Sequence, residues 1–267
     1  MKRKIDENDI LSLISKEDIK MIDLKIVDFW GILHHFSIPA ERFDKTSLED
    51  GFGFDGSNLG FGIEENSDFT AIPVLDTFFY DPVFDIKTAS FFCEIYSSEK
   101  NKKRVEEDPR YIALKAENFL ASKKIAEESM WSPELEFYIF DDIKIGNEPN
   151  LTFFEILSEE AYWNFKEGGG FSTIRKGEGY HSTPPKDVYL SLRNKMVLSL
   201  KEARISVKYH HHEVGSPGQN EIEFTFDPLL KTADKIILSK YIIKNEAKKD
   251  GKVVTFMPKP IFNEAGN

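Results

Sequence analysis

The sequence predicts an α+β fold, and three observations support this. Segments with the two-residue alternation of β-strands recur along the chain, and amphipathic stretches with the period of a helix lie between them. Glycine turns join neighbouring strand segments, as in antiparallel hairpins. A polar stretch from Ser97 to Arg104 interrupts this pattern and is the best candidate for a linker. The 267 residues allow one large domain or two smaller ones, and the linker favours domains at 1–103 and 104–267.

The first predicted domain begins with a short helix at residues 8–16. Residues 22–30 alternate like a half-buried strand, and Gly31 turns the chain into a hairpin partner at 32–38. Glycine and aromatic residues follow one another too irregularly in 51–62 for a core element, so we expect a functional loop there. Strands resume near 71–74 and 88–96.

The second predicted domain opens with a helix at Asp108-Pro109 that continues to Ser122, because proline is favoured in the first turn. The other expected elements are a strand at 133–141, a long irregular excursion at 142–183, a helix at 187–203, strands at 205–213 and 219–226, and a helix from Asp227-Pro228 to just before Gly251. In the helix at 187–203, the apolar stripe consists of Val188, Leu192, Met196 and Leu200.

Composition excludes several classes of function. The formal net charge of -11 argues against a nucleic-acid surface, since phosphate binding needs clustered Lys and Arg. The sequence lacks an apolar run of about 18 residues, so no membrane span is expected. The start of the chain lacks the apolar segment of a secretory signal. The single cysteine, Cys93, fits a reducing compartment. We therefore expect a cytoplasmic protein.

Two pairs of glutamates carry the chemistry. Glu134 and Glu136 lie one residue apart in a predicted strand, so their side chains leave the same face. Glu213 and Glu221 flank the turn Gly215-Ser-Pro-Gly218, which can bring them side by side. Four convergent carboxylates with nearby histidines form a site for hard divalent cations. An acidic edge strand facing solvent would be the commoner explanation for Glu134 and Glu136 alone.

Six motifs in order resemble bacterial and archaeal glutamine synthetase of type I. They are Phe54-Asp-Gly-Ser57 with Ser67-Asp68, Asp108-Pro-Arg110, Ser132-Pro-Glu-Leu-Glu-Phe137, His211-His-Glu-Val214, Gly218-Gln-Asn-Glu221 and Thr255-Phe-Met-Pro-Lys-Pro260. The resemblance implies a β-grasp amino-terminal domain followed by a catalytic α/β domain with a curved antiparallel sheet, truncated here. It implies a glutamate–ammonia ligase of nitrogen assimilation that uses ATP and forms γ-glutamyl phosphate.

The resemblance also implies roles for individual residues. It implies two or more Mg²⁺ or Mn²⁺ ions in a complete site, one held by Glu136, Glu213 and Glu221 and another held in part by Glu134. Asp55 matches the catalytic aspartate that binds and deprotonates ammonium, and the ammonium pocket further comprises Asp68, Tyr180 and Glu213. Phe226 matches a residue that contacts adenine, whereas Glu136 and Gly266 match residues that bind glutamate. The expected partners are ATP, glutamate and ammonia, and a full-length protein is expected to form a double-ring homo-oligomer.

The sequence departs from the family pattern at its end and near the ammonium pocket. It stops at Gly266-Asn267, so the resemblance spans roughly the first three fifths of a complete member, and we expect the chain alone to be inactive. Asn58, Glu178, His181 and Ala265 replace the usual residues. Two alternatives therefore stay open: a γ-glutamyl-amine ligase of the same superfamily, and a non-catalytic fragment that binds metal or takes part in assembly.

Overall fold

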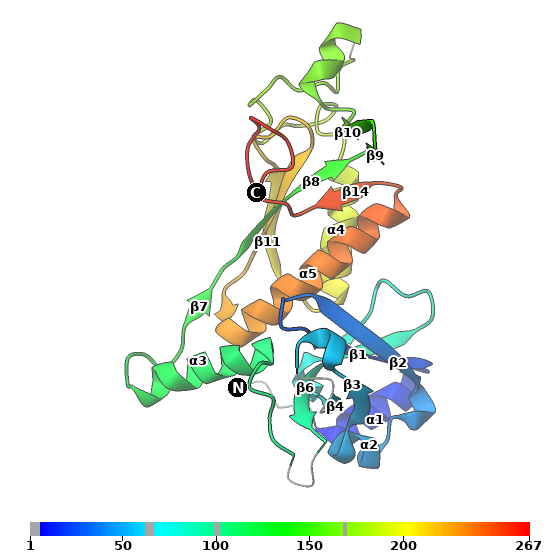
Figure 1. Ribbon diagram of the computed structural model, residues 1–267, viewed down its shortest axis with the longest axis vertical. Coiled ribbons are helices and arrows are strands. Elements are labelled where there is room, and N and C mark those ends of the chain that lie inside the picture. Colours follow the sequence, from blue (N-terminus) through cyan, green and yellow to red (C-terminus); the bar gives the residue numbers. More distant parts are fainter. Residues whose placement is uncertain (1–5, 62–66, 99–101, 168–169) are drawn as a thin grey trace. The chain divides into compact units, whose positions relative to one another are not determined.

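The computed structural model describes residues 6–61, 67–98, 102–167 and 170–267, which fold into two compact units (Figure 1). The first unit comprises Met1–Trp131, Glu202–Arg204 and Asp227–Ile237, and the second comprises Ser132–Lys201, Ile205–Phe226 and Leu238–Asn267. Residues 99–101 of the predicted linker, residue 62 of the glycine-rich segment and residues 168–169 lie outside the described residues. The domain boundary between residues 103 and 104 stays a prediction.

A six-stranded mixed sheet forms the centre of the first unit. Its order is β2-β1-β6-β4-β3, and β5 also pairs with β6. The strands are β1 (Met21–Val27), β2 (Leu33–Pro39), β3 (Phe52–Asp55), β4 (Asp68–Pro73), β5 (Phe79–Tyr80) and β6 (Thr88–Ser97). Strands β1 and β6 are parallel, and the other pairs are antiparallel. Helix α1 (Glu7–Lys16) starts at a capping box on Asp6 and buries Ile10 and Ile14 in the core of this sheet.

Two expectations for this unit need correction. Strand β1 ends at Val27 instead of Trp30, because the Asp28 carboxylate accepts hydrogen bonds from the backbone N–H groups of Trp30 (2.9 Å) and Ile32 (2.8 Å) and so forms the turn. The glycine-rich segment does contain a regular element, β3. Its residues Phe52 and Phe54 pack against the core, while the two residues that alternate with them are exposed, so the pattern is that of an edge strand.

The other regular elements of the first unit are helices and a short pairing of β7 (Met130–Trp131) with β13 (Asp227–Pro228). Helix α2 is Lys45–Asp50 and α3 is Pro109–Ser122. Asp108 caps α3 by accepting from the backbone N–H of Arg110, as the Asp-Pro start predicts. The buried Arg110 side chain also donates to Asp234 at 2.7 Å, on the first turns of α5 (Leu229–Lys249). Among the described residues, short 3-10 turns lie at Ala40–Arg42, Ser57–Leu59, Leu75–Thr77 and Tyr162–Glu167.

An antiparallel sheet of order β11-β12-β8-β14 forms the centre of the second unit. Its strands are β8 (Glu134–Phe140), β11 (Val207–His212), β12 (Gln219–Phe224) and β14 (Val253–Thr255). Helix α4 (Leu190–Glu202) buries Leu192, Met196 and Leu200 of its predicted stripe, whereas Val188 precedes the helix. None of the described helices is both long and apolar enough to cross a membrane.

The expectation of an irregular excursion from residue 142 is wrong for its first part. Residues 142–157 form an antiparallel hairpin of β9 (Asp142–Glu148) and β10 (Leu151–Leu157). Pro149 and Asn150 supply its turn. Most of the hairpin's side chains are exposed. Its alternation of apolar and polar residues is confined to Asp142–Ile145 in β9 and is interrupted at Phe153-Phe154 in β10, so the strand signal is weak.

Candidate metal centre

Three antiparallel strands place two rows of side chains on one face of the second unit's sheet. The row that we call the inner row consists of His211 on β11, Glu221 on β12 and Glu136 on β8. The outer row consists of Tyr209 on β11, Glu223 on β12 and Glu134 on β8. Residues directly opposite one another on antiparallel strands share a face, and so do residues two apart on one strand. All four glutamates therefore leave the same face of the sheet.

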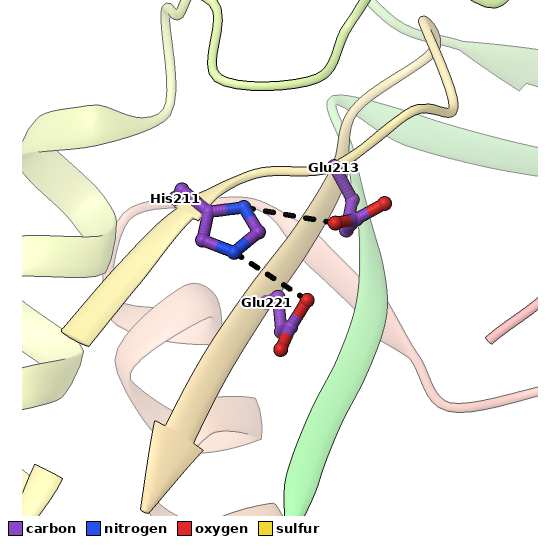
Figure 2. A group of neighbouring side chains, drawn as sticks. All are labelled: His211, Glu213 and Glu221. Atoms are coloured by element: carbon purple, nitrogen blue, oxygen red, sulfur yellow. Dashed lines mark ion pairs between the residues drawn. The ribbon is translucent and has the colours of Figure 1, made fainter. Parts of the chain in front are cut away.

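Glu213 joins the inner row from the turn that follows β11. Its backbone N–H donates to the carbonyl of Gln219 at 2.8 Å, which closes the turn and brings Glu213 close to Glu221, as the Gly215–Gly218 signal predicts. The His211 ring lies beside the two carboxylates and directs one nitrogen at each (Figure 2). Its Nδ1 is 3.7 Å from Oε1 of Glu213, and its Nε2 is 3.5 Å from Oε2 of Glu221.

The electrostatics of the inner row favour a bound cation. Burial, and then the neighbouring charge of Glu213, raise the pKa of Glu221 to about 7. Burial and the charges of Glu213 and Glu134 also raise the pKa of Glu136. Within the described parts of the chain, no Lys or Arg forms an ion pair with Glu136, Glu213 or Glu221. Carboxylate oxygens crowded together without a Lys or Arg partner fit Mg²⁺ or Mn²⁺ by the chemistry of their donors.

Gln219 connects this centre to the end of the chain. Its buried side-chain amide donates from Nε2 to Oε2 of Glu136 and to the carbonyl of Gly266, both at 3.0 Å. The Tyr138 hydroxyl donates to the carbonyl of Ala265 at 2.6 Å. The predicted metal ligand Glu136 and the predicted glutamate-binding Gly266 are thus held by one side chain.

Comparisons with known proteins identify the family. A family model of the glutamine synthetase catalytic domain matches residues 106–267, and a model of the glutamine synthetase β-grasp domain matches residues 18–98. The chain belongs to the glutamine synthetase family. The predicted α+β class, with a β-grasp domain followed by a catalytic domain, is confirmed.

Relatives of this family match almost the whole chain. A glutamine synthetase of Mycolicibacterium smegmatis is 40% identical over 269 residues, which cover 97% of this chain and 56% of that protein. One of Frankia alni is 42% identical over 265 residues, with the same two coverages. The solved cryo-EM structure of Plasmodium falciparum glutamine synthetase has a TM-score of 0.88 at 25% identity and covers 99% of this chain and 53% of its own. The chain thus spans little more than half the length of these relatives.

The remaining residues that the glutamine synthetase resemblance singles out lie in both units. In the first unit, Asp55 and Asp68 are direct cross-strand partners on β3 and β4. The Asp55 carboxylate accepts from the backbone N–H of Ser57 at 2.9 Å, and this bond lowers the pKa of Asp55. In the second unit, the exposed Tyr180 stacks on His181 with ring centroids 4.2 Å apart, and Phe226 is 63% exposed just after β12.

The three consecutive histidines, which the sequence leaves unassigned, have different surroundings. His210 accepts from Nε of Arg193 at 3.3 Å, through its Nδ1. His211 faces the inner row. His212 is fully buried and contacts Glu160 through Nε2 at 2.9 Å. Burial alone would lower the pKa of His212, but the hydrogen bond and the charge of Glu160 outweigh it, so that pKa is raised.

Sequence reasoning missed Glu223. The segment Glu221-Ile-Glu223 repeats the one-residue spacing that singled out Glu134 and Glu136. This spacing alone could have identified Glu223 as a residue on the same face as Glu221. The Gln219 and Glu160 contacts could not be read in the same way, because each connects segments far apart in the sequence.

Proposed function

We propose that the chain forms part of a glutamate–ammonia ligase, in which ATP drives amide formation through γ-glutamyl phosphate and supports nitrogen assimilation. The observation that carries this proposal is the inner row with Glu213, where three carboxylates converge beside His211 and none of them pairs with a Lys or Arg of the described residues. Membership of the glutamine synthetase family supplies the reaction.

Glu136, Glu213 and Glu221 would hold one Mg²⁺ or Mn²⁺ ion in this proposal. Such an ion, when bound, supplies the positive charge that stabilises phosphate oxygens during phosphoryl transfer. Gln219 would keep Glu136 in place through its hydrogen bond, because a carboxylate held by a second residue loses less freedom when it binds a metal ion.

The proposed ammonium pocket comprises Asp55, Asp68, Tyr180 and Glu213. The lowered pKa of Asp55 keeps this carboxylate ionised at neutral pH, and an ionised carboxylate both attracts ammonium and can accept its proton. Phe226 exposes an aromatic face that suits stacking on adenine. Gly266 and Glu136 would contact glutamate. A protein that contains this chain would act as a homo-oligomer.

Manganese binding to the purified chain tests the carboxylate assignment. We expect Glu136→Gln and Glu213→Gln each to reduce the affinity of the chain for one Mn²⁺ ion by about tenfold or more, because each substitution removes a charged ligand. Mn²⁺ can be titrated by electron paramagnetic resonance, which detects the free ion. Glu148→Gln is the matched control, since it removes an exposed charge on the hairpin strand β9. Unchanged Mn²⁺ affinity in the double variant of Glu136 and Glu213 would refute the proposal.

A second candidate function is a γ-glutamyl-amine ligase. The observation that favours it is His181, whose ring stacks on Tyr180 and lies 4.4 Å, between centroids, from His211. An imidazole beside a proposed ammonium residue changes the pocket that receives the nitrogen nucleophile. ATP turnover with glutamate, measured for a protein containing this chain with ammonia and with a panel of small amines, separates the two. Faster turnover with an amine establishes the second function.

A further inference from the structure

Hydrogen bonds fix the backbone of Glu213 on both sides of its side chain. Its N–H donates to the carbonyl of Gln219 at 2.8 Å, and its own carbonyl accepts from Nδ1 of the His212 ring at 2.6 Å. Its carboxylate accepts from the backbone N–H of Val214 at 2.8 Å. A side chain whose peptide groups are held in this way keeps one direction, so the His212 ring helps to direct the Glu213 carboxylate at the inner row.

Glu160 holds the opposite nitrogen of the His212 ring. Its Oε2 is 2.9 Å from Nε2, and neither side chain has exposed surface. Its Oε1 accepts from the backbone N–H of Val188 at 2.8 Å. The carbonyl of Glu213 can only accept, so Nδ1 donates to it wherever the proton between Glu160 and His212 lies. The ring is thus fixed at both nitrogens, with a donor turned to Glu213.

The backbone beside Glu213 also holds the segment that carries Tyr180. The N–H of His181 donates to the carbonyl of His212 at 2.9 Å, and the N–H of Gly179 donates to the carbonyl of Val214 at 3.3 Å. Tyr180 lies between these two bonds in the sequence. A shift of His212 or Val214 is therefore transmitted to the backbone on either side of Tyr180.

Gly179 shows how closely the two segments approach each other. A Cβ at this position would lie 2.4 Å from the carbonyl oxygen of Glu213 and 2.7 Å from Cε1 of the His212 ring. Both distances are too short for a real Cβ contact, so glycine is the residue that fits here without a shift of its neighbours. Residue 179 thus packs directly against the hydrogen bond between His212 and Glu213.

Stability alone does not explain a buried pair of Glu160 and His212. Removing a carboxylate and an imidazole from water is costly, and apolar side chains of similar volume often stabilise a core equally well. The Nδ1 of this ring is directed at one group, the carbonyl of Glu213. Because successive side chains of a strand leave opposite faces, His212 lies behind the face that carries His211 and the rest of the inner row. The pair therefore supports that face from behind.

We propose that Glu160 and His212 are positioning residues, which hold Glu213 and the backbone around Tyr180 in a fixed relation to each other. The inference rests on the proposed function, which places Glu213 and Tyr180 in the ammonium pocket and Glu213 on the ion of the inner row, here called the inner ion. A nucleophile reacts only when it is held at the right distance, and a misplacement of about 1 Å can lower the rate by about 100-fold. The pair thus serves the ammonium pocket without touching the substrate.

Two substitutions of His212 separate its two bonds. Asn can place an amide N–H near the position of Nδ1 and so keep a donor for Glu213, whereas Gln reaches the position of Nε2 and keeps only the contact with Glu160. We expect His212→Gln to lower the affinity of the purified chain for the inner ion, titrated as Mn²⁺ by electron paramagnetic resonance, by about tenfold. His212→Asn should recover most of this loss. His34→Gln, which changes a partly exposed histidine of the first unit, is the control and should leave the affinity unchanged.

A double-mutant cycle distinguishes positioning from a general loss of stability. If His212 acts through Glu213, His212→Gln should have little further effect on Mn²⁺ affinity in a chain that already carries Glu213→Gln. Equal effects of His212→Gln in the two backgrounds, or no effect in the unmodified one, would overturn the inference and leave the proposed function intact. Unchanged affinity in Glu213→Gln alone would instead overturn the proposed function, on which the inference rests.

Hydrogen exchange of the unmodified chain tests the inference even if the buried His212 variants misfold. Mn²⁺ should slow exchange at residues 179–182, because the inner ion fixes Glu213 while the N–H groups of Gly179 and His181 bond to the residues on either side of it. The exposed strands β9 and β10 of the same unit are the control and should exchange as before, since they open locally. Unchanged exchange at 179–182 in the chain with Mn²⁺ bound would overturn the inference.

Discussion

Lys25 lies with 1% of its side chain exposed between two buried carboxylates, Asp23 at 2.9 Å and Asp81 at 3.0 Å. His35 and Ser37 also contact Asp23, both at 2.6 Å. Here two buried carboxylates of the first unit's core share a lysine from within the chain. Among the described residues, the glutamates of the inner row have His211 beside them but no Lys or Arg, and this contrast is why we assign an external cation to them and none to Asp23.

The Asp23 carboxylate should contribute stability that depends on pH. Burial alone would raise its pKa, but Lys25, with hydrogen bonds from Ser37 and His35, outweighs burial and lowers it. A lowered folded-state pKa means that the stabilisation is complete above the unfolded pKa of about 3.9 and is lost as the pH falls through the folded value. We therefore expect Asp23→Asn to destabilise the chain at pH 7 by on the order of 3 kcal/mol, because it removes one partner of a buried pair.

Urea unfolding of the Asp23→Asn variant and the unmodified chain, from pH 7 down to pH 3, measures this effect. The difference in unfolding free energy should be constant near neutral pH and should shrink below about pH 4. Asp85→Asn, which removes an exposed carboxylate of the same unit, is the control and should show little difference at any pH. A difference for Asp23→Asn that stays constant down to pH 3 would contradict the pairing with Lys25.

At the scale of elements, the sequence predicts best where burial and turn chemistry agree. Helix α3 begins at Pro109 after its Asp108 cap, and β8 lies within the predicted 133–141. The hairpin β9–β10 is missed because its side chains are mostly exposed and its alternation of apolar and polar residues is short. The strand spacing predicts the shared face of Glu134 and Glu136, but only the register of β12 against β8 shows that Glu221 and Glu223 lie opposite them. Strand pairing is a long-range property that local spacing does not contain.

Gly218 controls the turn that brings Glu213 to Glu221. Its φ is +95°, and a Cβ there would lie 2.4 Å from the carbonyl oxygen of Ile139. Gly218→Ala should therefore destabilise the second unit by more than the roughly 1–2 kcal/mol of a left-handed backbone alone, and should also weaken Mn²⁺ binding. Gly177→Ala is the matched control, since Gly177 has φ +74° but open space around its Cβ position. Equal losses in the two variants, measured by urea unfolding and Mn²⁺ titration, would contradict a close approach at Gly218.

At the scale of the whole molecule, the chain consists of two compact units, and a hydrophobic core of residues from Ile10 to Val105 lies in the first. The proposed metal ligands all belong to the second unit, whereas Asp55 and Asp68 belong to the first. The motifs in the sequence predict this family and its two domains, because each motif is local. They do not predict Gln219 as the link between Glu136 and Gly266, because that contact joins a strand to a segment 47 residues further along.

Divalent cations should stabilise the two units unequally. A ligand that binds only the folded state adds stability of about 2.7 kcal/mol at a concentration 100 times its Kd, and the carboxylates that would bind it lie on β8, β12 and the turn at Glu213. Hydrogen exchange followed by mass spectrometry measures the stabilisation of each segment separately. Mn²⁺ should slow exchange in 134–140 and 219–224 of the second unit, and should leave 21–27 and 91–95 of the first unit unchanged.

Three comparisons make this measurement decisive. Removal of Mn²⁺ by a chelator should restore fast exchange in the strands of the second unit, because the ion binds reversibly. Glu213→Gln should reduce the protection, since it removes a ligand of the inner ion, whereas Glu148→Gln should keep it. Equal protection of both units by Mn²⁺ would show that they open together, since a ligand bound to one unit stabilises the other only when the two unfold in a single cooperative step.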